Sequence, residues 1–154
     1  MPPSCNFHGS EYIQQMKPMD DEQHIRTCAS AIIDALADRV KWRYDSLNGA
    51  LLTEFSADKE QVILPILRQH LPGQWDAKNV KQAPPLMIHR AGKYAKIHKK
   101  QKLLYPHGTE PPEVMLAWWP WGHGATVSIR LFAVNQEPFV PKKSLLKRWR
   151  SFFA

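Results

Sequence analysis

The seven histidines are the side chains of this chain best suited to acid–base chemistry near neutral pH. Metal-independent cleavage of RNA needs a general base, a general acid and cations that hold the phosphate. His89, His98 and His123 could act as acid and base, with Lys96 and Arg130 as cations, if the fold brings them together. No two histidines are four residues apart, as helical metal ligands often are, so we expect no metal and no other cofactor. A ribonuclease is one hypothesis, and it ranks below two binding hypotheses.

A long run of positive charge is the feature that leads to those hypotheses. Residues 77–109 contain eight Lys or Arg and no carboxylate. Long cationic side chains suit phosphate contact, and such binding would depend on salt and mostly not on base sequence. We therefore expect a non-enzymatic protein that binds RNA or DNA. The expected contact residues are Arg90, Lys93, Lys96, Lys99, Lys100, Lys102 and Arg130, with Tyr94 and Trp121 as candidates for stacking on bases.

The overall charge distribution also favours an acidic partner. Residues 1–70 carry 10 Asp or Glu against 7 Lys or Arg, whereas residues 71–154 carry 4 against 14. The formal charge thus runs from −3 in the first half to +10 in the second, which adds up to the total of +7. Because an acidic protein would meet the same surface, the alternative hypothesis is a protein-interaction adaptor or inhibitor.

Three tryptophans and a histidine crowd the segment between residues 118 and 124. Side chains alternate along a strand, so Trp118 and Trp119 should lie on opposite faces, with Trp118 in the core and Trp121 at the tip of a turn. An exposed indole there could stack on a base or anchor a protein partner.

The first half of the chain predicts two helices and a hairpin. Residues 1–19 lack periodicity and look like a flexible leader. Apolar residues at helical spacing predict a helix over 21–39, with Cys28 as a small core residue on its apolar stripe. Two β-prone runs around Asn48-Gly49 predict a hairpin. Ser56 could cap a second helix over 57–70, which Pro65 should kink or split.

The second half predicts most of the sheet. We expect a loop over 73–85, a strand over 86–90, and then a segment, 92–104, whose pattern fits a helix or a strand. Strands are predicted over 114–119 and 125–134, the second with a polar face where a ligand would bind. Residues 141–154 have the pattern of a short basic amphipathic helix.

Together these elements predict an α+β protein in which two helices from the first half pack on an antiparallel sheet of about four to six strands. A single domain over 20–140 fits the length of 154 residues. Two cysteines make no disulfide framework, and no apolar run reaches the ~18 residues of a membrane span. We expect a cytoplasmic protein without stable membrane association. The sequence motifs of P-loop nucleotide, dinucleotide, serine-hydrolase and zinc-protease sites are absent from the chain.

Overall fold

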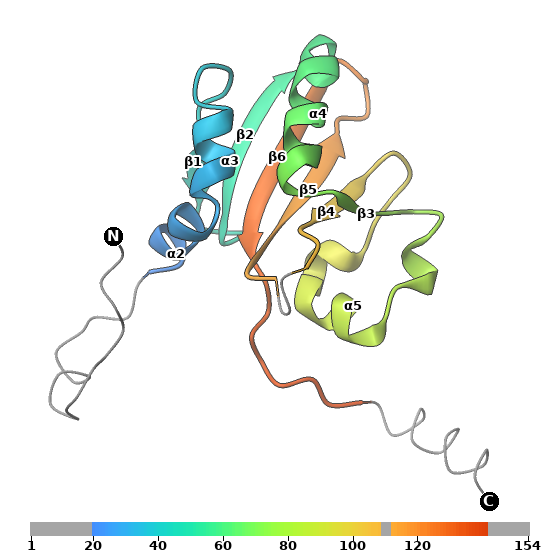
Figure 1. Ribbon diagram of the computed structural model, residues 1–154. Coiled ribbons are helices and arrows are strands. Elements are labelled where there is room, and N and C mark those ends of the chain that lie inside the picture. Colours follow the sequence, from blue (N-terminus) through green and yellow to red (C-terminus); the bar gives the residue numbers. More distant parts are fainter. Residues whose placement is uncertain (1–19, 109–111, 142–154) are drawn as a thin grey trace, which may run out of the picture.

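The computed structural model describes residues 20–108 and 112–141. They form an α+β fold around an antiparallel sheet of six strands in the order β1-β2-β6-β5-β4-β3 (Figure 1). The predicted class, with an antiparallel sheet of four to six strands, is confirmed. The strands are β1 (Arg43–Asp45), β2 (Ala50–Ser56), β3 (Gly73–Asp76), β4 (Lys102–Tyr105), β5 (Val114–Pro120) and β6 (Thr126–Ala133).

The helices of the described residues fall into two groups. Those that precede β3 are α2 (Asp21–Cys28), α3 (Ser30–Ala35), η1 (Ala57–Lys59) and α4 (Glu60–His70). Those between β3 and β4 are η2 (Val80–Gln82), α5 (Pro85–Ala91) and η3 (Gly92–Ala95). In Figure 1 α3 and α4 cross one face of the sheet, whereas α5 lies apart from them at the end of the yellow-green segment.

The larger core lies between that first face of the sheet and the helices α2, α3 and α4. From β6 it receives Val127, Ile129 and Leu131, which alternate along the strand as predicted, and from β5 it receives Trp118, 1% exposed. Phe55 of β2 lies against Trp118 with ring centroids 5.5 Å apart.

A smaller core covers the second face. Met115, Ala117 and Phe132 from the two central strands pack there against Ala91 and Tyr94, which come from α5 and η3. The segment between β3 and β4 is therefore held on the second face by its own apolar side chains.

The first predicted helix, 21–39, is broken. The Asp20 carboxylate accepts the Gln23 N–H (2.7 Å) and caps α2, which ends at Cys28. Ala29 leaves the helical region (φ −104°, ψ 17°), and α3 ends at Ala35. The apolar stripe survives the break, since Ile25, Ala29, Ile32 and Leu36 are all buried.

The hairpin at Asn48-Gly49 is confirmed, with β1 and β2 antiparallel and Gly49 at φ 61°. The prediction at Ser56 is wrong, and Pro65 does not split the helix. The Ser56 side chain caps nothing, because the turn η1 separates it from α4. Pro65 lies exposed inside α4, which continues through it to His70 at the cost of one backbone hydrogen bond.

Two predictions between residues 73 and 91 are also wrong. Gly73–Asp76 forms the edge strand β3 instead of a loop, and residues 86–90 belong to helix α5 instead of a strand. Pro85 is the first residue of α5, where a helix needs no N–H, and a run of five residues is too short to show its period. The leader over 1–19 and residues 142–154, which hold nearly all of the predicted C-terminal helix, lie outside the described residues.

Candidate nucleic-acid interface

Most of the predicted contact lysines lie on the connection between β3 and β4. This connection, residues 77–101, contains seven Lys or Arg and no Asp or Glu. It packs on the second face of the sheet through Ala91 and Tyr94, so its polar side chains turn outward. Its exposed lysines are Lys78, Lys81, Lys93, Lys96, Lys99 and Lys100.

A tight turn just before β4 presents two of these lysines together. The Gln101 N–H donates to the His98 carbonyl (3.0 Å), and the His98 N–H donates to the Gln101 side-chain oxygen (2.9 Å). Between them, Lys99 and Lys100 are exposed. Lys100 has φ 69° and is the one non-glycine residue of the described ranges with a positive φ. An unfavourable backbone conformation at a lysine is tolerated here in a turn that two hydrogen bonds between His98 and Gln101 close.

Two hydrogen bonds tie η3 to the β1–β2 turn. Lys93 Nζ donates to the Asn48 side-chain oxygen (3.0 Å), and the Tyr94 hydroxyl donates to the Asn48 carbonyl (3.2 Å). The basic connection therefore has a fixed position on the sheet, although Asn48 is 45 residues away from Lys93.

Tyr94 cannot stack on a base, and its prediction as a stacking residue is wrong. Only 4% of it is exposed, and its ring stacks on Phe132 at a centroid distance of 4.0 Å. Burial raises the pKa of its hydroxyl, an effect that the nearby Arg130 charge partly offsets. Tyr94 anchors η3 to the second face.

Arg130 is half-buried on β6. Thr126, Ser128 and Arg130 share one face of the strand, but the prediction of an open polar face is wrong, because Ser128 is 3% exposed and the smaller core covers this face. Its guanidinium carbon lies 4.4 Å from the centre of the Trp119 ring, and its Nη1 donates to the Ser128 hydroxyl (3.2 Å). Its Nε is buried without a hydrogen-bond partner, and no carboxylate of the described residues lies within 4.0 Å of the guanidinium. Asn48 lowers the pKa of nearby Asp45 by hydrogen bonding, and the charge of Arg130 lowers it further. Arg130 is thus a cation with unused donors.

Two other predicted contact residues are less available. Lys102 belongs to the first face of the sheet, where it pairs with Trp118 across β4 and β5, and its Nζ lies 6.0 Å from the Trp118 ring. Arg90, in the last turn of α5, is half-buried, and its Nε is buried without a hydrogen-bond partner. The exposed lysines are better placed for phosphate contact than either residue.

The two tryptophans before the β5–β6 turn lie on opposite faces, as predicted: Trp118 belongs to the larger core and Trp119 to the smaller one. Trp121, in the turn, is 43% exposed, and its ring meets His123 edge-on at 5.5 Å. The turn lies at the same end of the sheet as Lys99 and Lys100, because Lys102 and Trp118 are paired. Trp121 is therefore the exposed aromatic side chain at the lysine end of the sheet.

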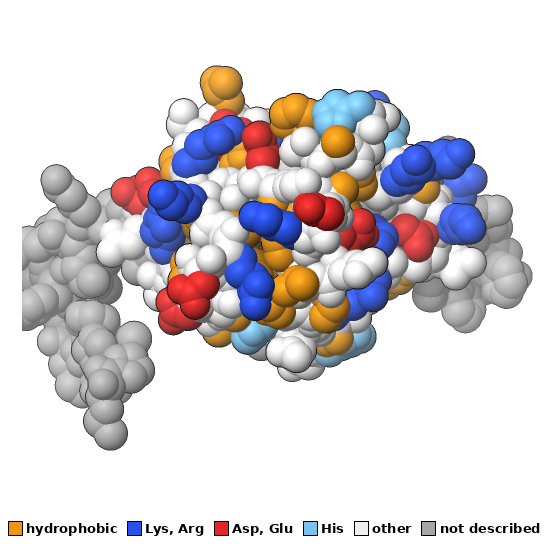
Figure 2. Space-filling model, turned by 90° about the horizontal axis from the view of Figure 1, so that it is seen from above, with side chains coloured by type: hydrophobic (Ala, Val, Ile, Leu, Met, Phe, Trp, Pro, Cys, Tyr) orange, Lys and Arg blue, Asp and Glu red, His pale blue; other side chains and the backbone are white. Residues whose placement is uncertain are grey.

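The charges do not form one uninterrupted patch. Figure 2 shows the end of the molecule that is uppermost in Figure 1, where Lys and Arg side chains gather in several places with Asp and Glu between them. Among the described residues the ion pairs are Arg26–Glu22 (3.0 Å) and Arg43–Glu54 (3.4 Å), both in the first half of the chain. The lysines of the β3–β4 connection have no ion-pair partner among the described residues.

The three histidines proposed for RNA cleavage are not brought together in one place: His98 lies in the turn before β4, at the same end of the sheet as His123, whereas His89 lies at the other end. His89 hydrogen-bonds through Nε2 to the Glu137 carbonyl (2.7 Å), beyond the C-terminal end of β6. His123 precedes the N-terminal end of that strand, where its Nδ1 accepts the Ala125 N–H (3.0 Å). Eight residues of strand, a length of roughly 25 Å, separate the two ends. His89 and His123 therefore cannot act on one phosphate, and within the described ranges no cluster of His, Cys, Asp and Glu is arranged to hold a metal ion.

One cluster of polar side chains, formed by His24, Cys28 and Glu113, was not identified from the sequence. His24 and Cys28 are four residues apart on α2, and both ring nitrogens of His24 lie within 3.9 Å of the Cys28 sulfur. The Cys28 thiol donates to Glu113 (2.8 Å), which is 85 residues away. The His–Cys spacing was visible in the sequence, but the approach of Glu113 depends on the sheet and had no sequence signal.

The chain has no significant match to a protein-family model, to a curated protein or to a solved structure. In the described ranges, every helix is too short or too polar to cross a membrane. The function must therefore be argued from the geometry above.

Proposed function

We propose that this protein binds single-stranded RNA or other nucleic acid through the β3–β4 connection, without catalysing a reaction. The observation that carries the proposal is the connection itself, residues 77–101, which holds seven Lys or Arg, no carboxylate and no ion pair within the described residues. Cations that are not neutralised by the protein are free to displace the counterions of a phosphate backbone.

Four exposed lysines within eight residues form the central part of the interface, which we call the lysine segment: Lys93, Lys96, Lys99 and Lys100. Arg130 supports the same proposal from the adjoining sheet, because its guanidinium forms no ion pair within the described residues, although the charge of Asp45 is near enough to interact with it. Trp121 is the stacking candidate that remains once Tyr94 is assigned to the core.

The proposal is tested by a triple variant, Lys96→Ala, Lys99→Ala and Lys100→Ala. All three side chains are exposed, so the fold should survive their truncation. With four phosphate contacts, the affinity for single-stranded RNA should fall about 50-fold between 50 and 200 mM salt, whereas with one contact it should fall about threefold. The measurement is fluorescence anisotropy with a labelled oligonucleotide at both salt concentrations.

The matched control carries the same charge change elsewhere: Lys41→Ala, Lys59→Ala and Arg68→Ala, all exposed. It should retain the steep salt dependence. Equal losses in the two triple variants would show that net charge alone drives binding, and the proposed interface would then be wrong.

A second candidate, an adaptor or inhibitor that binds an acidic protein, is favoured by the exposed Trp121 in the β5–β6 turn. Exposed tryptophans often dominate protein interfaces. For this candidate, Trp121→Ala should abolish capture of the partner while leaving unfolding unchanged, and RNA should not bind even at 50 mM salt. Undiminished capture by Trp121→Ala would count against it.

A further inference from the structure

A cavity of about 540 Å³ lies on the first face of the sheet, at the end opposite to the lysine turn. It opens among the C-terminal ends of α2 and α4, the N-terminal end of β5 and the chain that follows β4 and β6. This volume is within the range of small-molecule sites. The lining residues are Cys28, Ala29, Ala31, Ile32, His70, Leu71, Pro106, Glu113, Val114 and Gln136.

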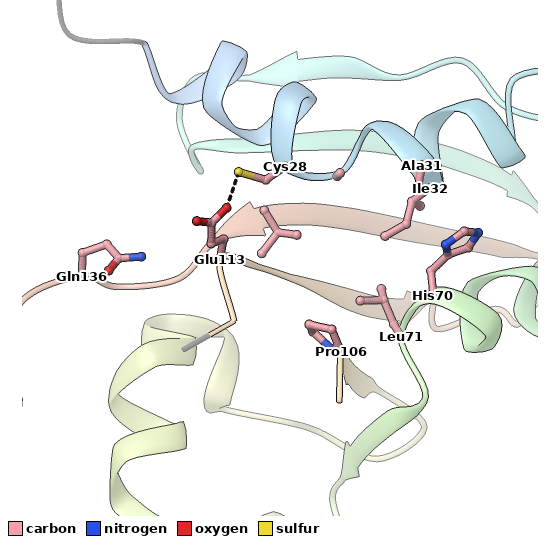
Figure 3. A pocket seen from close by; sticks show the side chains of 10 residues that line it. Cys28, Ala31, Ile32, His70, Leu71, Pro106, Glu113 and Gln136 are labelled. Carbon is pink, nitrogen blue, oxygen red and sulfur yellow. Dashed lines mark hydrogen bonds between the residues drawn. The ribbon is translucent and has the colours of Figure 1, made fainter. Parts of the chain in front are cut away.

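The walls of the cavity are mostly apolar, and its polar groups are few. The apolar wall is formed by Ile32, Leu71 and Val114. Figure 3 shows the polar side chains of Cys28 and Glu113 together on one side of the cavity and His70 on the other. Among the described residues that line the cavity, Glu113 alone carries a full negative charge, and none is a Lys or Arg. In a protein of formal charge +7, this site has the opposite electrostatic character to its surroundings.

The hydrogen bond from Cys28 orients the carboxylate of Glu113, which is an exposed residue. The thiol donates to one Glu113 oxygen at 2.8 Å. Burial, followed by the Glu113 hydrogen bond and charge, raises the pKa of Cys28 to about 11. The thiol therefore keeps its proton at neutral pH and remains a donor, and the other Glu113 oxygen has no hydrogen-bond partner among the described residues.

We propose that this cavity binds a small organic cation, an amine with an apolar body, whose ammonium group pairs with Glu113 while its body lies against Ile32, Leu71 and Val114. Charge complementarity selects the cation, since a neutral ligand of the same shape gains only the apolar contact and an anion is repelled. This site is separate from the lysine segment and does not depend on nucleic-acid binding.

The test uses the full chain with benzylamine, which is positively charged at pH 7, and benzyl alcohol, its neutral counterpart of similar shape. Isothermal titration calorimetry at 150 mM salt should show saturable binding of one benzylamine, with benzyl alcohol at least tenfold weaker. Glu113→Gln should weaken benzylamine roughly ten- to hundredfold and leave benzyl alcohol unchanged. The matched control, Glu137→Gln, removes an exposed carboxylate that does not line the cavity and should change neither probe.

A steric variant covers the case in which Glu113→Gln does not fold. Ala31 lines the cavity and is exposed, so Ala31→Trp should fill the opening without disturbing the core, and both probes should lose their binding. Thermal unfolding of each variant reports on the fold. Absence of saturable benzylamine binding, equal affinities for the two probes, or unchanged benzylamine binding by folded Glu113→Gln would each overturn the proposal.

Discussion

Lys100→Gly should stabilise the protein while weakening its binding to nucleic acid. Lys100 has φ 69°, where the Cβ of an L-residue crowds the backbone at a cost of about 1–2 kcal/mol. Glycine has no Cβ and avoids this cost. The Lys100 side chain is exposed in the His98–Gln101 turn, so the substitution removes no packing.

The net effect on stability is the difference of two terms. Relief of the backbone conformation gains about 1–2 kcal/mol, and the greater freedom of glycine in the unfolded chain costs about 0.5–1 kcal/mol. We expect a net gain of about 0.5–1 kcal/mol, or roughly 2 °C in Tm for a chain of this length. One phosphate contact is lost at the same time, so the slope of log affinity against log salt should fall by about 0.7 for single-stranded RNA.

The matched control is Lys99→Gly, the neighbouring exposed lysine, whose φ is not positive. It removes the same charge without relieving the backbone, and should destabilise by about 0.5–1 kcal/mol. Urea denaturation measures the stability of both variants, and anisotropy measures their binding to RNA. The two should weaken binding similarly and change stability in opposite directions. A lower stability of Lys100→Gly than of the unaltered protein would refute the assignment of this turn.

Two further predictions concern packing at Gly73 and the partly buried thiol of Cys28. In Gly73→Ala the new methyl group would overlap the Tyr105 ring, so urea denaturation should show that the free energy of unfolding falls by about 1–3 kcal/mol. Adding Tyr105→Ala should recover most of that penalty. Additive losses in the double variant would contradict this contact. In a Cys5→Ser background, iodoacetamide should alkylate Cys28 slowly below pH 10, because burial and then Glu113 raise the pKa of its thiol from 9.0 to about 11. Glu113→Gln should speed the alkylation at pH 9. The folded state keeps the Cys28 thiol proton to higher pH than the unfolded chain does. The stability linked to this proton is therefore complete below pH 9 and is lost as the pH rises from about 9 to 11. Rapid alkylation at pH 8 would contradict the raised pKa.

The central strands and the first hairpin could be predicted because their signals are local. Alternation in β6 separates Val127, Ile129 and Leu131 from the polar side chains, and Gly49 supplies the positive φ of the hairpin turn. Helix α5 was missed because five apolar and basic residues after a proline pair carry too short a pattern to distinguish a helix from a strand. The edge strand β3 forms only because β4, 26 residues further on, pairs with it.

The candidate interface was predictable in composition but not in detail. The lysines of the β3–β4 connection follow from the sequence, since charged side chains stay exposed wherever they are not paired. The burial of Tyr94 depends on Phe132, and the position of Arg130 depends on Trp119 across the β5–β6 pair. Contacts between distant residues of this kind are set by strand register, which a single sequence does not reveal.

The salt dependence of RNA binding tests the central claim most directly. The unaltered protein and the Lys96→Ala, Lys99→Ala, Lys100→Ala variant should be titrated against labelled single-stranded RNA at 50 and 200 mM salt. Our account predicts a fall in affinity of about 50-fold for the unaltered protein and about threefold for the variant. Absence of binding at 50 mM salt, or the same salt dependence in both proteins, would contradict it.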